Sequence, residues 1–150
     1  MLDGLFVTPA ATAIAEALAS AAVAAGGRIA VVGNARLAAA LAAERDVLPI
    51  GMSARAARKL PKNLPDTASL EAHSLAAVVG VDVATDDAWA DTLRAWIRAV
   101  RDGGAIVFLD RGHAKEASRR ALCAGLAELE QRRAGRAVIT SGLVTHLRDP

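Results

Sequence analysis

Aromatic side chains are scarce in this sequence: they make up 3% of its 150 residues, and tyrosine is absent. Proteins that hold single-stranded nucleic acid do so largely by stacking bases on aromatic rings. The formal net charge is only +2, which is too small to indicate binding to a polyanion. We therefore expect no nucleic-acid partner.

The chain has one cysteine, Cys123. A lone cysteine cannot form a disulfide within the chain, which favours a reducing compartment, and we expect a cytoplasmic protein. Cys123 lies in an apolar helical stretch, so we predict a buried and unreactive thiol. The histidines His73, His113 and His146 are far apart and form no metal-ligand pattern, so no metal site is predicted.

Little in the sequence indicates targeting or a membrane span. The most apolar stretch, Ala10–Ala25, follows Asp3 rather than a basic segment, and Glu16 interrupts it. This pattern is neither that of a signal peptide nor that of an apolar span of about 20 residues. We expect no contact with a membrane.

Hydrophobic residues, many of them alanine, make up 53% of the chain, which excludes a disordered protein. A chain of 150 residues suits one continuous core, and no internal repeat is visible. We expect a single domain over residues 1–150.

Short continuous apolar runs alternate with helical patterns along the sequence. Such runs are typical of strands that are buried on both faces. We expect strands at Arg28–Val32, Val47–Ile50, Leu75–Val83 and Ala105–Leu109, with Pro49 confining the second to an edge. The alternation predicts an α/β fold in which helices cover both faces of a mostly parallel sheet.

Capping residues mark the expected helices between these strands. Thr8 and Pro9 begin the first, which is expected to reach Ala25. The others are Ala35–Glu44 after Asn34, a short helix from Ser53 to Leu60, Ala88–Arg101 after Asp86 or Asp87, and a long helix over Ala114–Arg133. Ala137–Leu147 is expected to form one strand or a tight hairpin about Ser141 and Gly142.

Four segments, in order, resemble a class I S-adenosylmethionine-dependent methyltransferase: Ile29–Leu41, Val47–Leu60, Leu64–Val83 and Leu93–Asp110. The stretch Leu93–Val107 is similar to the family's helix, basic turn, paired glycine and strand. The resemblance implies a three-layer α/β/α Rossmann-like methyltransferase fold. Its sheet is expected to have about five to six strands, mostly parallel, with an antiparallel strand near the C-terminus.

The family's first cofactor motif is a strand that ends in an acid, followed by glycines at alternate positions. Gly33 matches the first glycine, but Val31 replaces the acid, and Ala35 and Leu37 replace the next two glycines. Such glycines let a backbone approach its ligand closely. We expect Leu37 and Arg36 to crowd the methionine and ribose of a cofactor.

Two further acids of the family pattern are missing. The acid after the second strand becomes Gly51, or Met52 if the register slips by one, and Ala76 replaces the acid of the fourth strand. These losses predict that no cofactor binds, with S-adenosylmethionine as the alternative. Should a cofactor bind, its expected contacts are Gly33, Asn34, Gly51, Met52 and Asp82.

Catalytic residues are not assigned from the sequence. Asp82 ends a strand at the expected crevice, where an acid is either catalytic or a simple cap, and Asp110 has the same ambiguity. The interpretation is a non-catalytic, methyltransferase-like protein that acts by binding another protein. The alternatives are a minimal active methyltransferase and a sensor of a small molecule or nucleotide.

Self-association is expected through an exposed edge strand. The stretches Ala137–Thr140 and Leu143–Thr145 are uncharged and β-prone, and the family's usual third strand is short or absent between Leu60 and Leu75. An unprotected edge invites pairing with another chain. A homodimer is predicted because twofold symmetry is the commonest closed arrangement, with a different protein partner as the alternative.

Overall fold

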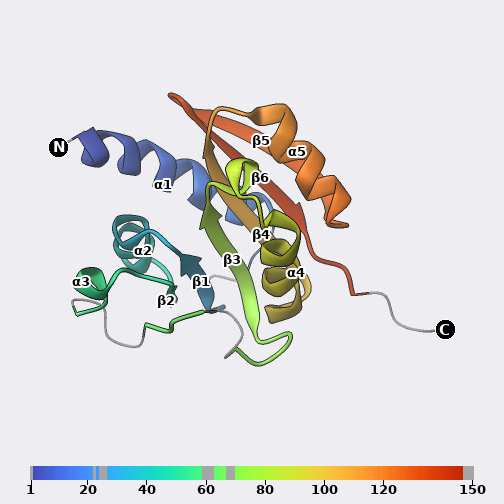
Figure 1. Cartoon of the computed structure of the whole chain (residues 1–150), viewed down its shortest axis with the longest axis horizontal. Coiled ribbons are helices and arrows are strands. Elements are labelled where there is room, and N and C mark those ends of the chain that lie inside the picture. Colours follow the sequence, from blue (N-terminus) through green and yellow to red (C-terminus); the bar gives the residue numbers. More distant parts are fainter. Residues whose placement is uncertain (1, 22, 24–26, 59–62, 67–69, 147–150) are drawn as a thin grey trace.

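The computed structural model describes residues 2–21, 23, 27–58, 63–66 and 70–146. Its centre is a six-stranded sheet in the order β2-β1-β3-β4-β6-β5 (Figure 1). The strands are β1 (Ile29–Val32), β2 (Val47–Ile50), β3 (Leu75–Val81), β4 (Val100–Arg111), β5 (Ala127–Ala134) and β6 (Ala137–Leu143). The first four are parallel, and β6 is antiparallel to both β4 and β5.

Helices cover both faces of this sheet, as the sequence predicted (Figure 1). On one face, α1 (Leu2–Ser20) and α2 (Ala35–Ala42) enclose a core that includes Ile14, Leu18 and Leu37. On the other, α4 (Trp89–Ala99) and α5 (Ala114–Cys123) enclose a core around Trp96 and Phe108. The short α3 (Ala54–Ala57) follows β2, and a 3₁₀ turn, η2 (Val83–Thr85), follows β3.

The N-terminal helix differs from its prediction at both ends. It begins at Leu2 and contains Pro9 in its interior. A proline removes one backbone hydrogen bond of a helix, and a long helix can tolerate this loss. It ends at Ser20 rather than Ala25. The N–H of Val23 donates to the carbonyl of Leu18 at 3.0 Å, a bond typical of helix ends, and Val23 is buried in the core.

The long helix predicted over Ala114–Arg133 is wrong, because only its first half is helical. Helix α5 ends at Cys123, and Gly125 then adopts a φ of +90°, which breaks the helix. The chain continues as β5, which pairs along the outer side of β6. Cys123 is exposed at this helix end, so the prediction of a buried thiol is also wrong.

The C-terminal strand is antiparallel, as predicted, but it is not an edge. β6 lies between β4 and β5, so the expected exposed edge at Ala137–Thr140 does not exist. The hairpin turn lies at Gly135, between β5 and β6, rather than at Ser141 and Gly142. Leu147 lies outside the described residues.

The predicted second strand is an edge strand, as Pro49 indicated. Helix α4 stops at Ala99, and Val100 already belongs to β4, so the predicted helix end at Arg101 is wrong by two residues. Asp86 precedes α4, and its Oδ1 accepts a hydrogen bond from the N–H of Ala88, the N-cap residue, at 2.9 Å. Within the described residues, no helix is both long and apolar enough to cross a membrane.

Candidate cofactor-binding site

The carboxyl ends of β1 and β2 border a hollow of about 350 Å³. The strands β2 and β3 lie on opposite sides of β1, so the strand order reverses between β1 and β3, next to this hollow. Ligands of open α/β sheets bind at such points. The lining consists of Val32, Ile50, Gly51, Pro65 and Asp66 on one side and of Asp91, Thr92, Ala95 and Trp96 of α4 on the other.

Two glycines turn the chain at this edge of the sheet. Gly33 has a φ of +77° and Gly51 a φ of +66°, values that other residues adopt only with strain. The N–H of Gly33 donates to the carbonyl of Ile50 at 2.9 Å, which ties the end of β1 to the end of β2. A Cβ at Gly51 would lie 3.7 Å from the Pro65 carbonyl oxygen, an ordinary contact, so the positive φ rather than lack of space favours glycine here.

A short extended segment places an acid in the hollow. The N–H of Gly51 donates to the Leu64 carbonyl at 2.9 Å, and the N–H of Leu64 donates to the Pro49 carbonyl at 3.0 Å. These bonds form a single parallel bridge between Ile50 and Leu64, in place of a full third strand. The bridge brings Asp66 next to the end of β2, where the resemblance led us to look for an acid at Gly51 or Met52.

The opposite wall is fixed by a tryptophan on a glycine. A Cβ at Gly80 would lie 2.0 Å from Cη2 of Trp96, so only glycine lets the indole ring lie directly on β3. The Trp96 side chain is 4% exposed and Leu93, one turn earlier, is fully buried. This contact anchors α4, and it thereby positions Asp91 and Thr92 at the rim of the hollow.

The altered residues of the cofactor motif lie outside this hollow. Leu37 is 2% exposed and packs into the core beneath α1, and Val31 is completely buried in the same core. Arg36 is exposed. Neither Leu37 nor Arg36 lines the hollow, and whether they crowd a bound cofactor stays a prediction.

The other predicted contacts are spread over this edge of the sheet. Gly51 lines the hollow and Gly33 follows its floor residue Val32. The Oδ1 of Asn34 accepts the N–H of Leu37 at 2.9 Å and so caps α2. Met52 is half-buried against the core on the α1 and α2 face. Asp82 is exposed after β3, with a φ of +57°.

Asp82 has a buried acidic neighbour, Asp110, at the end of β4. Asp110 is 1% exposed, and its Oδ1 accepts the N–H of Ala84 at 2.8 Å. Its Oδ2 is buried without a partner among the described residues. Burial raises the pKa of Asp110; the Ala84 N–H opposes this rise, Asp82 adds to it, and His113 and Arg120 counteract it. Asp110 thus holds the turn after β3 in place.

Asp66 and Asp91 were not predicted as site residues from the sequence. Asp66 reaches the hollow only through the backbone bridge at Leu64, and Asp91 only through the packing of Trp96. Both depend on contacts between distant segments. The available signal was the Leu64-Pro65 pair, which resembles the family's approach to its fourth strand and is followed directly by Asp66.

We compared the chain with known protein families, curated proteins and solved structures. No protein-family model matches the sequence, and no curated protein matches it. Solved structures do match. The chain is similar to a chain in the complex between the Haloferax volcanii Trm112 methyltransferase activator and a protein described as a methyltransferase. The TM-score is 0.71 and the identity is 14%, covering 91% of this chain and 90% of that one. The chain has the Rossmann-like fold of class I methyltransferases.

Two more similar structures bear on the cofactor. A protein from Methanococcus maripaludis that is described as an S-adenosyl-L-methionine-dependent methyltransferase has a TM-score of 0.70 and 12% identity, covering 95% of this chain and 87% of that one. The T. thermophilus 16S rRNA N2 G1207 methyltransferase, in complex with AdoMet and guanosine, has a TM-score of 0.61 and 19% identity, covering 83% of this methyltransferase-like chain and 37% of its own.

These neighbours correct the prediction that no cofactor is used. That prediction is contradicted, because structures with this fold include one described as S-adenosylmethionine-dependent and one with AdoMet bound. The physical reason lies in the motif positions. Val31 and Leu37, which stand where the family pattern has an acid and a glycine, lie on the core side of β1 and α2. They therefore leave the hollow at the strand ends unobstructed.

Proposed function

We propose that this methyltransferase-like domain binds S-adenosylmethionine in the hollow beside Gly51 and transfers its methyl group to an acceptor. The observation that carries the proposal is the hollow itself, about 350 Å³ next to the strand-order reversal. Its size falls within the range of about 300–1,000 Å³ that is typical of small-molecule sites. The methyltransferase likeness of the fold supports the same ligand.

The lining residues fit the parts of this cofactor. The carboxylates of Asp66 and Asp91 are acceptors for the ribose hydroxyls, the task that the family pattern gives to an acid at Gly51. Val32, Ile50 and the edge of Trp96 offer apolar contact to the adenine. When bound, the cofactor supplies a methyl group on a positively charged sulfur, and the chain's task is to orient it toward an acceptor.

Asp82 is the residue we assign to the acceptor side. Its carboxylate is exposed and follows β3, whose carboxyl end lies at the same edge as the hollow. An exposed carboxylate there accepts a proton from an incoming nucleophile. Asp110 cannot do this directly, because its free oxygen is buried; it positions the turn that carries Asp82.

Binding of S-adenosylhomocysteine, the demethylated product, tests the proposal without needing the acceptor. A ligand at a hundredfold excess over its Kd stabilises the native state by about 2.7 kcal/mol, which thermal denaturation detects. Asp66→Asn should weaken binding about tenfold, as the loss of a charged hydrogen-bond acceptor does. Asp87→Asn, which changes an exposed acid outside the hollow, is the matched control. Wild-type protein that is not stabilised by a large excess of the ligand would overturn the proposal.

A second candidate is a non-catalytic domain that acts by binding a protein. The absence of an acid at Gly51 and Met52 favours it, and one similar structure is a complex with a methyltransferase activator. The partner, or a second copy of the chain, would pair with one of the two edges, β2 or β5. For this second candidate we expect S-adenosylhomocysteine to bind without any transfer of a methyl group. We also expect light scattering to give a molecular mass above the 15.4 kDa of one chain.

A further inference from the structure

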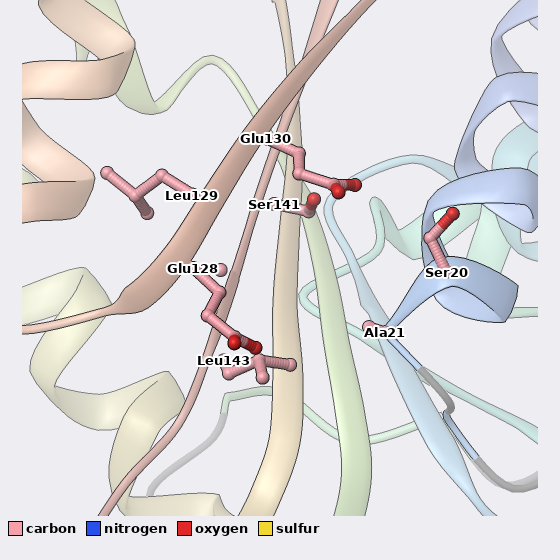
Figure 2. A pocket seen from close by; sticks show the side chains of 8 residues that line it. Ser20, Ala21, Glu128, Leu129, Glu130, Ser141 and Leu143 are labelled. Carbon is pink, nitrogen blue, oxygen red and sulfur yellow. The ribbon is translucent and has the colours of Figure 1, made fainter.

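A second pocket, of about 440 Å³, lies far from the cofactor hollow, between the end of α1 and the β5–β6 hairpin (Figure 2). It is lined by Ser20, Ala21, Glu128, Leu129, Glu130, Ser141, Gly142 and Leu143. Leu143 pairs with Ala105, near the amino-terminal end of the parallel part of β4, whereas the cofactor hollow lies at the opposite, carboxyl ends of the strands. The pocket therefore has no part in the proposed methyl transfer.

A bulge in β5 places two carboxylates on one side of the sheet. Ala127 pairs with Leu143 and Glu130 pairs with Ser141, so two residues of β5 stand opposite Gly142 alone. Glu128, at the bulge, has a φ of +50°, a conformation that is uncommon for a residue other than glycine. The bulge turns Glu128 to the same side as Glu130, while Leu129 points away toward α5 (Figure 2).

Ser141 supplies an unused polar group between these acids. It is only 6% exposed, yet its hydroxyl makes no hydrogen bond with the part of the chain that the structure describes. Figure 2 shows this hydroxyl pointing from β6 into the pocket, toward α1. Asp110 Oδ2 and Arg132 Nε are the polar side-chain atoms that are fully buried without a partner in the described residues, so the Ser141 hydroxyl is open to the pocket and available to a ligand.

The charges around the pocket favour a cation. Arg132 lies at its border, where its Nη2 donates to Ser20 Oγ at 2.6 Å. The Arg132 guanidinium is shared between Glu16 and Glu130, each 3.6 Å away. Glu128 has no ion pair among the described residues. Two carboxylates thus contact the Arg132 guanidinium, and the pocket lining adds the Glu128 carboxylate, which has no such partner.

The structure assigns this pocket to a small primary alkylammonium ligand. An ammonium group donates three hydrogen bonds, which Glu128, Glu130 and the Ser141 hydroxyl can accept. Leu143 and Ala21 border the pocket on its apolar side and suit a short hydrocarbon chain. A metal ion fits less well, because no group of three or more His, Cys, Asp or Glu in the described residues is placed to hold one.

Amide NMR of the wild-type protein, titrated with n-butylammonium chloride, tests this assignment. We expect saturable shifts for Ser20, Ala21 and the residues 141–143, and no such shifts with 1-butanol, which has the same chain without the charge. Glu128→Gln and Glu130→Gln should each raise the Kd about tenfold, as the loss of a charged acceptor does. Glu71→Gln, an exposed acid elsewhere, makes the same charge change and should leave the Kd unaltered.

Several outcomes would overturn the assignment. These are the absence of saturable shifts, equal shifts with 1-butanol, or equal shifts with calcium chloride, which would indicate a site for simple cations. A loss of affinity in Glu71→Gln equal to that in Glu128→Gln would show only a general charge effect. Should either glutamate variant fail to fold, Ser141→Ala and the wild-type titration still decide the question.

Discussion

The indole ring of Trp96 packs directly on Gly80 of β3, and its removal should destabilise the domain. The indole is 4% exposed and its ring occupies the space that a side chain at position 80 would fill. Trp96→Ala removes this ring and leaves a cavity, at a cost of roughly 3–5 kcal/mol. Because about 1 kcal/mol corresponds to roughly 2–4 °C in a domain of this size, the Tm should fall by roughly 6–20 °C.

A double-mutant cycle measures the coupling free energy between Trp96 and Gly80. Gly80→Ala in the wild-type protein forces a methyl group into the ring and should cost about 1–3 kcal/mol. In the Trp96→Ala background the same methyl group enters a cavity, so this cost should vanish and the cycle should give a coupling of about 1–3 kcal/mol. Urea denaturation monitored by circular dichroism provides all four free energies of unfolding.

Trp89→Ala is the control for this cycle. Trp89 is only half-buried, and its ring lies 5.7 Å and 5.3 Å below the guanidinium carbons of Arg119 and Arg120. Its loss should cost less than the loss of Trp96 and should show no coupling to Gly80. An unchanged Tm in Trp96→Ala, or purely additive effects of Trp96→Ala and Gly80→Ala, would refute the packing described here.

Further variants test the buried acid, the helix cap and the altered motif. Burial raises the folded-state pKa of Asp110, so the folded state binds more protons than the unfolded state, and stability should fall as pH rises from about 4 through that raised pKa. Asp110→Asn should therefore raise the Tm at pH 7 and lose this advantage near pH 4; a lower Tm at pH 7 would contradict it. Asn34→Ala should cost about 1 kcal/mol, because α2 loses its cap, and an unchanged free energy in urea denaturation would argue against the bond to Leu37. Leu37→Gly, which restores the family's glycine, should cost about 2–5 kcal/mol and leave S-adenosylhomocysteine affinity unchanged; tighter binding in calorimetry would show that Leu37 obstructs the site after all.

The parallel part of the fold could be predicted because local signals agreed there. The apolar runs of β1 to β4, the cap at Asn34 and the glycine at Gly33 all indicated the same elements. The C-terminal third was harder. Ala127–Ala134 is rich in residues that favour helices, and it becomes a strand because it pairs along β6. The local sign of the break in the sequence is Gly125, which the structure shows with a positive φ.

The candidate site was predictable in position but not in its acidic residues. The edge at Gly33 and Gly51 followed from the order of the strands. Whether Leu37 faced the ligand or the core depended on the packing of α2 against α1, which the sequence does not specify by itself. Asp66 and Asp91 line the same hollow only because two distant segments are held there by a backbone bridge and by Trp96.

A crystal structure of the protein grown with S-adenosylhomocysteine would show whether the hollow beside Gly51 is the cofactor site. We expect ligand density in this hollow, with the ribose hydroxyls within hydrogen-bonding distance of Asp66 or Asp91 and the adenine against Val32 and Trp96. Density at another place on the molecule, or a ligand-free hollow in crystals grown at saturating ligand concentration, would contradict it.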